Sequence, residues 1–416
     1  MTGHISKKSK RVIFILGLLT AIGPFSIDMY LPAFPAIAKD LHTSVAHVML
    51  SLSSFFIGVS VGQLLYGPLL ERYGRKRPLY AGLVLYLLAS VGCALATSID
   101  TLIVLRFFQA LGGCAGMVAA RAIVRDLFEV KENAKIFSTL MLIMAVSPII
   151  APTLGGYVTA AYSWRIVFVL LIAVNLLIIG GVYFLLPESK PPDSNFSLRP
   201  QAITKGFTAI LTHPQFYVYA LTGAIAASGL YAYISGSPYV FLNIFHVNEK
   251  QYGWIFAFIA AGIIGSSQIN SFALRKYTSE QLVLWALACQ ALVGMTMVAF
   301  VALGFVTLYS LVILIFLFLC CQGFVFPNTS ALSLAAFGHR AGNASAMLGA
   351  VQLGIGAGVS ALVSVLQNGT ALPMAGVMAG CSTLALTVYL WGRKMKIKKP
   401  TLEETEEEDL EMISSL

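Results

Sequence analysis

Charged residues are scarce in this sequence. Only 11% of the 416 residues are Asp, Glu, Lys or Arg, whereas 58% are hydrophobic. An ordinary soluble domain carries about 25% charged residues, and a water-exposed surface cannot be covered with so few. We therefore exclude an ordinary soluble protein and expect the lipid bilayer to be the solvent of most of the chain.

Patterns that carry enzyme or metal chemistry are also lacking. The six cysteines lie inside apolar stretches without a CxxC pair, and the six histidines lie in loops or near the ends of apolar blocks. No HExxH or phosphate-binding loop occurs, and no strand precedes the spaced glycines Gly354, Gly356 and Gly358. We predict that the protein is not an enzyme, that it binds no metal or cofactor, and that its cysteines are packing residues.

Long apolar blocks are what the sequence has in abundance. A helix needs about 20 apolar residues to cross about 30 Å of hydrocarbon, and the first block continues past that length without a signal-peptide cleavage site. The pattern predicts an all-α membrane protein with twelve transmembrane helices, at residues 12–38, 47–70, 78–97, 101–125, 134–159, 164–187, 215–242, 250–273, 281–303, 306–330, 341–367 and 372–394.

Basic residues are distributed unevenly between the loops. Of the 27 Lys and Arg residues, 23 fall on the side that carries both termini, three (Lys39, Arg165 and Lys250) fall on the other side, and Arg106 lies within a span. Cytoplasmic loops carry an excess of Lys and Arg. We therefore predict a multi-pass protein of a bacterial-type cytoplasmic (inner) membrane with both termini cytoplasmic. This topology explains the net charge of +9 without a nucleic-acid partner.

The longest hydrophilic interruption divides the spans six and six. When the chain is shifted on itself by 204 residues, Gly58 meets Gly262 and the loops between the second and third spans of each part coincide. Duplicated halves around a central site are a common transporter plan. We predict two pseudo-symmetric halves, with the chain divided into a cytoplasmic N-terminus 1–11, a six-helix bundle 12–187, a cytoplasmic linker 188–214, a second six-helix bundle 215–394 and a solvated, charged cytoplasmic tail 395–416.

Two charges lie deep inside predicted spans. Asp28 is the one clearly intramembrane acid among 18 acidic residues, and Arg106 is the one deep basic residue. Such charges cost several kcal/mol unless paired or hydrated, which favours a functional role. The helix rise places them about 15 Å and about 8 Å from the outer ends of their spans. We predict that they interact directly or through water, and that Asp28 binds a coupling proton. An ion pair that only orients helices is the alternative.

The turn between the second and third spans is short and charged. It contains Gly67, Glu71, Arg72, Gly74, Arg75 and Lys76. Glycine permits a tight turn, and the arginines can pair with Glu71 and with Asp126 at the end of span four. We interpret this cluster as a conformational latch. The alternative is a simple positive-inside stop signal.

Span five contains two prolines and two glycines close together, at Pro148, Pro152, Gly155 and Gly156. Proline removes backbone donors and glycine removes side-chain bulk, so the helix is expected to bend and to pack closely against a neighbour. Such a helix would be flexible at the seam between the halves; close packing without a gating role is the alternative.

Four of these stretches resemble motifs of the major facilitator superfamily. They are Ile27 to Pro32, the turn from Gly67 to Lys76, Arg106 with Gln109, and Pro148 to Gly156. The likeness is greatest to the drug:proton antiporters of the Bcr/CflA type, which include bicyclomycin and amphenicol exporters. It implies multidrug or antibiotic efflux, driven by the proton gradient through alternating access.

The resemblance also implies roles for single residues. Asp28 matches the proton or substrate carboxylate of the family, Arg106 its conserved-motif arginine, and the span-five motif the one that distinguishes antiporters from symporters. The cytoplasmic charge relay of the family corresponds to Glu71, Arg75 and Asp126. Glu71 stands where the family usually has Asp, which is a mild chemical change.

Polar and aromatic residues within the spans are candidates for substrate contacts, and we expect fewer than half of them to touch substrate. With one acid and one base in the cavity, neutral or zwitterionic compounds are favoured over strong cations. The expected partners are a small-molecule substrate, protons and lipid, with the chain monomeric. A proton-coupled importer of a metabolite is the main alternative, and a channel or membrane receptor a remote one. The candidates are Tyr30, Gln109, Tyr231, Tyr233, Gln268, Asn270, Gln322, Asn328 and Gln352.

Overall fold

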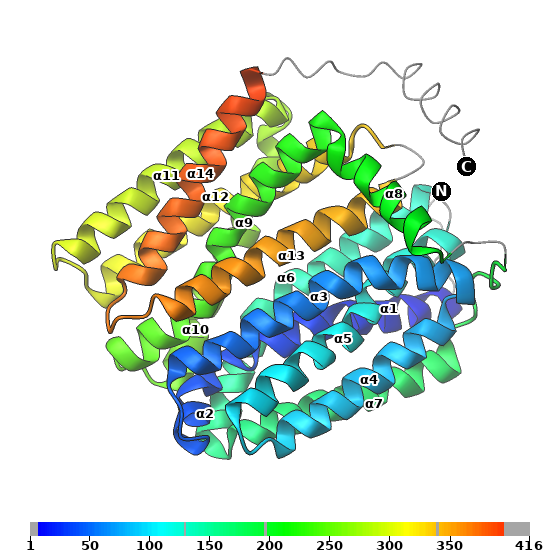
Figure 1. Cartoon of the computed structure of the whole chain (residues 1–416), viewed down its shortest axis with the longest axis horizontal. Coiled ribbons are helices and arrows are strands. Elements are labelled where there is room, and N and C mark those ends of the chain that lie inside the picture. The colour runs from blue at the N-terminus through cyan, green and yellow to red at the C-terminus, as the bar shows by residue number, and fades with distance from the viewer. Residues whose placement is uncertain (1–6, 129, 195–197, 338–340, 395–416) are drawn as a thin grey trace.

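The computed structural model describes residues 7–128, 130–194, 198–337 and 341–394. Within these ranges twelve helices are long and apolar enough to cross a membrane, which confirms the predicted all-α membrane fold (Figure 1). The first six residues of the predicted N-terminal segment and the predicted tail 395–416 lie outside the described residues.

After α1, the spanning helices of the first half begin and end within a few residues of the predicted spans. Several begin at a Ser or Thr whose side chain accepts a backbone N–H of the first turn, as Ser44 does from His47. In chain order they are α1 (Lys7–Asp28), η1 (Leu31–Ala33), α2 (Phe34–Asp40), α3 (Val45–Tyr73), α4 (Lys76–Leu95), α5 (Ile99–Leu127), α6 (Val130–Ala161) and α7 (Trp164–Leu185).

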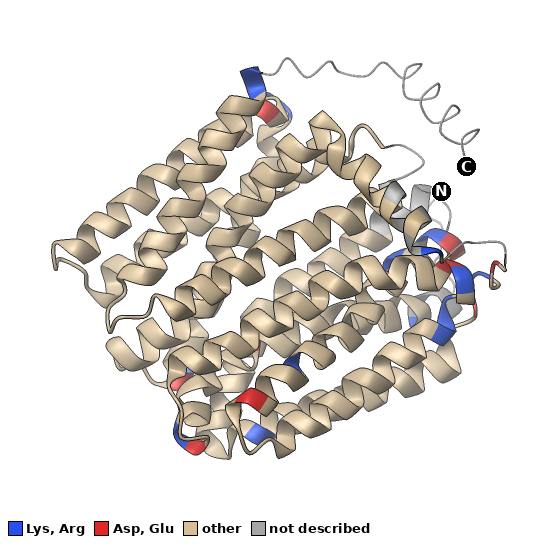
Figure 2. Cartoon of the chain, viewed as in Figure 1, with Lys and Arg blue, Asp and Glu red and all other residues tan. Residues whose placement is uncertain are grey.

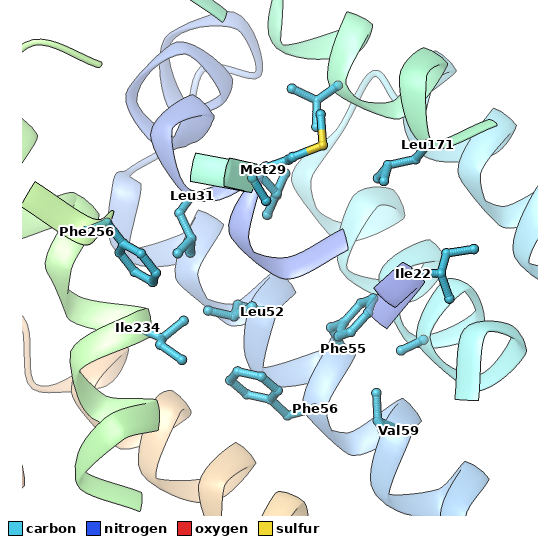
Figure 3. Close-up of a cluster of buried hydrophobic side chains, with 14 of the residues drawn as sticks. Ile22, Met29, Leu31, Leu52, Phe55, Phe56, Val59, Leu171, Ile234 and Phe256 are labelled. Atoms are coloured by element: carbon cyan, nitrogen blue, oxygen red, sulfur yellow. The ribbon is translucent and has the colours of Figure 1, made fainter. Parts of the chain in front are cut away.

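The second half repeats this plan after a short helix, α8, which lies within the predicted linker. Both halves contribute to one hydrophobic cluster, and Figure 3 shows Ile234 and Phe256 of the second half facing Leu31 and Leu52 of the first. The elements are α8 (Pro200–Thr212), α9 (Pro214–Pro238), η2 (Tyr239–Ile244), α10 (Glu249–Ala273), α11 (Ser279–Ala302), α12 (Leu308–Leu334), α13 (Ala341–Val365) and α14 (Leu372–Lys394).

The first span is broken, although the sequence predicts one helix over residues 12–38. The α-helix ends at Asp28, and the chain passes through the single turn η1 before α2 completes the crossing. Pro32 has no N–H to donate to the preceding turn, and Leu31 before it is disfavoured in helical conformation. The N–H of Tyr30 therefore bonds to the carbonyl of Ile27 at 3.2 Å, which leaves the carbonyl of Ser26 free for another donor.

One of the two seams between the halves is formed by α3 and α13, which lie side by side in Figure 1. Serine side chains cross this seam along its length. Ser53 donates to Ser360 at 2.8 Å, Ser60 donates to the carbonyl of Ala350 at 2.8 Å, and Ser364 donates to the carbonyl of Ala46. Small hydroxyl residues thus hold the two helices in close contact.

The other seam is formed by α6 and α10, and glycines allow its close contact. A Cβ at Gly156 would meet the carbonyl of Glu249, and one at Gly253 would lie 2.7 Å from the Cα of Thr153. A Cβ at Gly155 would meet the backbone of Met29, at the break after α1. The halves are therefore closed against each other at the end of the molecule that carries α2, which we call the α2 end.

α6 continues as one helix through both of its prolines. The bend that we predict at Pro148 and Pro152 stays a prediction.

A larger residue at Gly156 is expected to weaken the contact at the α2 end. The side chain of Gly156→Val would displace the backbone of α10 at Glu249, whereas Gly180 in α7 has open space beside it, so that Gly180→Val is a matched control. Tyr157 and Lys250 face each other across this seam, with the ammonium 5.1 Å from the ring centre. Cysteines at these two positions should form a disulfide at least tenfold more slowly in Gly156→Val. Equal rates in both variants would contradict the expectation.

Charged residues lie mainly at the ends of the helices, and Figure 2 shows a dense group where α3 turns into α4. We call this end of the molecule, which also carries α8, the α8 end. It is the end to which the sequence assigns the cytoplasm.

Candidate functional site

A cavity of about 760 Å³ lies between the two halves, walled by α1 and α6 on one side and by α9 and α10 on the other. Its wall is mostly aliphatic and aromatic. The polar side chains among the lining residues are Asp28, Ser138, Tyr233, Ser267 and Gln268. The volume suits a drug-sized ligand, because such pockets measure about 300–1,000 Å³.

A smaller hollow of about 430 Å³ lies between α2 and the junction of α6 with α7. It is walled by the first half alone, and its one carboxylate, Asp40, is paired with Arg165 and bonded by Trp164. This hollow has no wall from the second half, so it does not serve alternating access between the halves.

Asp28 is the one ionisable carboxylate in the wall of the larger cavity. It is only 4% exposed and lies at the last residue of α1. Among the described residues, no side chain or backbone N–H bonds to its carboxyl group. A buried carboxylate without a partner carries a large desolvation cost when charged, so its charge state responds strongly to what occupies the cavity.

Arg106 lies behind this wall, is completely buried and does not line the cavity. It donates to the side-chain oxygen of Gln109 at 2.6 Å and to the carbonyl of Ser26 at 3.0 Å. Its guanidinium also lies 4.4 Å from the ring centre of Tyr30 and 4.3 Å from that of Phe55, in the geometry of a cation–π contact.

Asp28 and Arg106 therefore form no ion pair among the contacts that the structure shows. The guanidinium instead bonds to the carbonyl that the break in α1 leaves free, two residues before Asp28. The direct contact that we predict between Asp28 and Arg106 is not among these bonds, and an interaction through water stays a prediction. Arg106 instead holds the last turn of α1 at Ser26.

Three further residues complete a ring of hydrogen bonds around Arg106, and sequence reasoning did not select them. Gln109 donates to Ser90 at 2.8 Å, Ser90 donates to the carbonyl of Tyr86 at 2.7 Å, and the hydroxyl of Tyr86 pairs with that of Ser26 at 2.6 Å. The ring joins α1, α4 and α5. The sequence does carry a signal for two of them, because Tyr86 and Ser90 are hydroxyl residues one helical turn apart in an otherwise apolar span.

Of the nine predicted substrate contacts, Tyr233 and Gln268 line the cavity. The hydroxyl of Tyr233 is buried, no residue that the structure describes lies within hydrogen-bond distance and geometry of it, and its ring stacks on that of Phe256 with ring centres 5.4 Å apart. Tyr30 and Gln109 belong to the surroundings of Arg106, where Tyr30 also pairs with Ser51 at 2.8 Å.

Four of the other five candidates bond or pack between helices. The side chain of Asn328 donates to that of Asn270 at 2.7 Å, and Gln322 accepts from Gln290 at 3.3 Å. Tyr231 packs against Phe56 across the seam, with ring centres 4.9 Å apart, and the fifth is the buried Gln352. None of the five is among the residues that line the cavity, and their contact with substrate stays a prediction.

At the α8 end, the predicted charge cluster is formed. Arg75 donates to both oxygens of Asp126, at 2.7 and 3.3 Å, and to Glu71 at 2.9 Å. Gly74 has a φ of +80°, a conformation that favours glycine. Burial on its own would lower the pKa of the Arg75 guanidinium, but the hydrogen bonds to Asp126 and Glu71 outweigh it and leave the pKa raised. Arg75 therefore stays charged at any working pH.

The linker supplies partners that sequence reasoning did not assign to this cluster. The carboxylate of Glu188 accepts the backbone N–H groups of Arg75, at 2.7 Å, and of Lys76, at 3.2 Å, and so caps the start of α4. Lys190 pairs with Glu71, and Ser189 donates to Asp126 at 2.8 Å.

The remaining predicted members take less central positions. The ammonium group of Lys76 donates to the backbone carbonyl of Leu186 at 2.8 Å. The guanidinium of Arg72 donates to the backbone carbonyl of Asp193 at 3.4 Å. Gly67 has open space beside it. The partners shown for the cluster all belong to the first half or to the linker. Whether it latches the two halves stays a prediction.

Replacing Arg75 by Ala is expected to destabilise the protein by about 1–2 kcal/mol, because two carboxylates lose their shared donor. This destabilisation is small for the loss of charged hydrogen bonds, because Glu71 and Asp126 are partly exposed to water. Thermal unfolding in detergent micelles measures the effect, with Arg77→Ala, at an exposed neighbouring position, as the control. If both variants unfold at the wild-type temperature, the cluster does not contribute to stability.

Twelve spanning helices in two halves, with a cavity that both halves wall, define a membrane transporter of small molecules. The chain belongs to the Major Facilitator Superfamily, whose sequence model matches residues 16–361. This confirms the resemblance noted in the sequence and the prediction that the protein is not an enzyme.

Similar proteins agree with this assignment. The chain is 36% identical to an uncharacterized MFS-type transporter, YdgK, of Bacillus subtilis, over 89% of this chain and 92% of the relative. It is 30% identical to a bicyclomycin resistance protein homolog of Haemophilus influenzae, over 95% of this chain and 99% of that relative. It is 28% identical to the multidrug resistance protein MdtL of Citrobacter koseri, over 89% and 93%. The latter two, a bicyclomycin resistance protein homolog and a multidrug resistance protein, agree with the resemblance to drug exporters noted in the sequence.

Solved structures share the fold. A bacterial homologue of the human lysosomal transporter Spinster, in an inward-facing and unoccupied conformation, superposes with a TM-score of 0.72 at 14% identity, over 95% of this chain and all of the other. A D-xylose–proton symporter superposes with a TM-score of 0.71 at 14% identity, over 91% and 97%. At such low identity the likeness concerns the fold alone.

Proposed function

We propose that the protein exports drug-like small molecules in exchange for protons, by alternating access of the cavity between its halves. The observation that carries this proposal is the lone carboxylate of Asp28 in the wall of an otherwise uncharged cavity. The names of two relatives, a bicyclomycin resistance protein homolog and a multidrug resistance protein, support the choice of substrate class. The proton gradient is the energy source, and no cofactor is required.

The orientation that the Lys and Arg residues predict tells which side of the membrane the cavity would face. With both termini in the cytoplasm, the α8 end is cytoplasmic and the α2 end faces outward. The contacts of Gly156 and Gly253 between the halves then close the outer side, and the cavity lies on their cytoplasmic side. This is the state in which an exporter loads its substrate.

Coupling follows from the isolation of Asp28. The charged carboxylate has no protein partner shown in this state, so a substrate group or water must offset its desolvation. Protonation from the outer side removes the charge and releases a substrate held by it. A membrane potential of 100 mV supplies about 2.3 kcal/mol per charge, and each pH unit about 1.4 kcal/mol. Either the membrane potential or the pH gradient is therefore sufficient to move substrate against its concentration gradient.

The cavity changes the expected substrate. The preference for neutral or zwitterionic compounds assumes one acid and one base in the cavity, but Arg106 does not line it. We therefore propose apolar molecules that carry one hydrogen-bond donor or one positive charge, which would face Asp28.

Purified protein in proteoliposomes, acidic outside, tests the proposal. A panel of amphenicols, bicyclomycin and lipophilic cations such as tetraphenylphosphonium is added, and proton movement is followed with a pH-sensitive dye. An exporter exchanges protons for substrate in opposite directions. Movement in the same direction would show the importer alternative, and flux without any proton movement would show a channel.

A further inference from the structure

The cavity between the halves is elongated. On α10 its lining residues run from Phe256 to Gln268, and on α6 they run from Ser138 to Pro148. At 1.5 Å per residue these stretches measure about 18 Å and about 15 Å. A volume of about 760 Å³ spread over such a length is a narrow space that follows the two helices. A ligand that fills it is therefore elongated as well.

The end of the cavity toward the α2 end carries its charge. Asp28 and Tyr233 lie there, and we call these two residues the carboxylate pole. The ring of Tyr233 stacks on that of Phe256, and Figure 3 shows Phe256 facing Leu31, three residues after Asp28. Neither the carboxyl group of Asp28 nor the hydroxyl of Tyr233 has a hydrogen-bond partner among the described residues. This pole suits a cation, because a buried carboxylate needs a compensating partner.

The end of the cavity toward the α8 end is polar but uncharged. Its polar residues are Ser138, Ser267 and Gln268, which we call the amide pole. Gln268 lies five residues before the end of α10, and Ser138 lies eight residues after the start of α6. None of the three side chains forms a hydrogen bond with a residue that the structure describes. Hydroxyl and amide groups both donate and accept, so this pole suits an uncharged polar group such as a carboxamide.

The cavity wall between the two poles is apolar. On α10 it consists of Ile259, Ala260, Ile263 and Ile264, and the lining residues of α6 and α9 between the poles are apolar too. A polar group held beside this stretch would lose its water without gaining a partner. The wall therefore favours ligands whose polar groups lie at the two ends.

We propose that the cavity selects two-ended substrates, which carry a cation for the carboxylate pole and an uncharged hydrogen-bonding group for the amide pole, joined by an apolar body. Ser267 and Gln268 are then specificity-determining residues. This inference rests on the export function proposed above and adds the substrate class, since Asp28 alone requires only one polar group on the substrate.

The distance between the poles sets the length of the apolar body. The poles lie about 18 Å apart along α10, and a hydrogen bond of about 3 Å at each end leaves about 12 Å. An extended chain gains about 1.2 Å per single bond, a third of its rise per residue in an extended peptide. The best substrates should therefore have about ten single bonds between the cation and the uncharged polar group.

Binding to the purified protein in lipid nanodiscs tests this class without any transport measurement. The probes are straight-chain amines that end in a carboxamide, with about five to about fifteen methylene groups, and n-alkylamines of the same lengths. Isothermal titration calorimetry gives the Kd of each probe, and empty nanodiscs give the background. We expect the carboxamide to lower the Kd about fivefold or more near ten methylene groups, as one or two hydrogen bonds would, and less than about twofold at the shortest length.

Variants of the amide pole test which residues read the second end. In Gln268→Met and in Ser267→Ala the advantage of the carboxamide should fall below about twofold, while the Kd of the alkylamine of equal length stays within about twofold of the wild-type value. Ser271→Ala is the matched control, because Ser271 lies one turn further along α10, is exposed and is not among the residues that line the cavity. This control should keep the full advantage.

The outcomes separate the substrate class from the export function. If the carboxamide gives no advantage at any length, or the same advantage in Gln268→Met and Ser267→Ala as in the wild-type protein, the two-ended class is wrong. Efflux of the probes from proteoliposomes, driven by a pH gradient, would then still support the export function. If the advantage depends on Gln268 and Ser267 but the wild-type protein moves no probe against a gradient, the export function is wrong and the two-ended binding site stands.

Discussion

Replacing Asp28 by Asn is expected to abolish uphill transport and to leave the protein folded. An amide has nearly the shape of the carboxylate but cannot gain or lose a proton near neutral pH. For an exchange of one proton for one uncharged substrate, a gradient of two pH units sustains an accumulation ratio of up to about 100 in the wild-type protein. The variant should reach a ratio of about 1.

The structure also predicts what this variant retains. Because no described group bonds to the carboxyl of Asp28, the substitution leaves no protein partner unsatisfied, and the melting temperature should not fall. Exchange of labelled for unlabelled substrate without a gradient should continue, since the cavity keeps its shape. Asp100→Asn, at the exposed start of α5, is the control. An accumulation ratio of wild-type size in Asp28→Asn would show that another group carries the proton.

Replacing Arg106 by Lys is expected to destabilise the protein by about 2–4 kcal/mol, although the charge is conserved. The ammonium of lysine is a compact point charge and cannot reproduce the planar fork that serves Ser26 and Gln109 together. A buried acceptor that loses its donor costs about 1–3 kcal/mol. The stacking of the guanidinium between Tyr30 and Phe55 is lost as well.

Thermal unfolding of the purified variants measures this effect. Arg165→Lys is the matched control, because Arg165 pairs with Asp40 at the surface and such a pair contributes at most about 1 kcal/mol. If the melting temperature fell equally in Arg106→Lys and Arg165→Lys, the role of Arg106 in holding the end of α1 would be contradicted. A transport assay should show that Arg106→Lys also slows export, since Asp28 follows the carbonyl of Ser26 by two residues.

The sequence was sufficient for the fold because hydrocarbon allows few structures. Backbone groups in hydrocarbon must bond within the protein, and a helix satisfies nearly all of them, so every apolar block except the first became a single spanning helix close to its predicted ends. The break after Asp28 was not predicted, because hydropathy averages over a window and gives no weight to the missing N–H groups of Pro32 and Pro35. The helix α8 was not predicted either, since we interpreted residues 188–214 only as a cytoplasmic linker between the two bundles.

The site was predicted less completely. Composition alone selected Asp28 and Arg106, because charge in hydrocarbon is rare and costly. Their geometry depends on the rotation of each helix about its axis and on the path of a long side chain, and neither can be read from spacing. The same limit explains why Gln322 and Asn328, which are polar and lie in spans, bond between helices, whereas Ser138 lines the cavity without having been selected.

The linker bonds described at the α8 end bear on how the chain could be divided. Leu186, Glu188, Ser189 and Lys190 all bond to α3, α4 or α5, so this stretch belongs structurally to the first bundle although it follows α7. A gene cut after codon 194 would therefore give a first fragment that retains its own stabilising bonds. Two separately encoded fragments could meet in the membrane and restore the transporter, as two subunits of a dimer do.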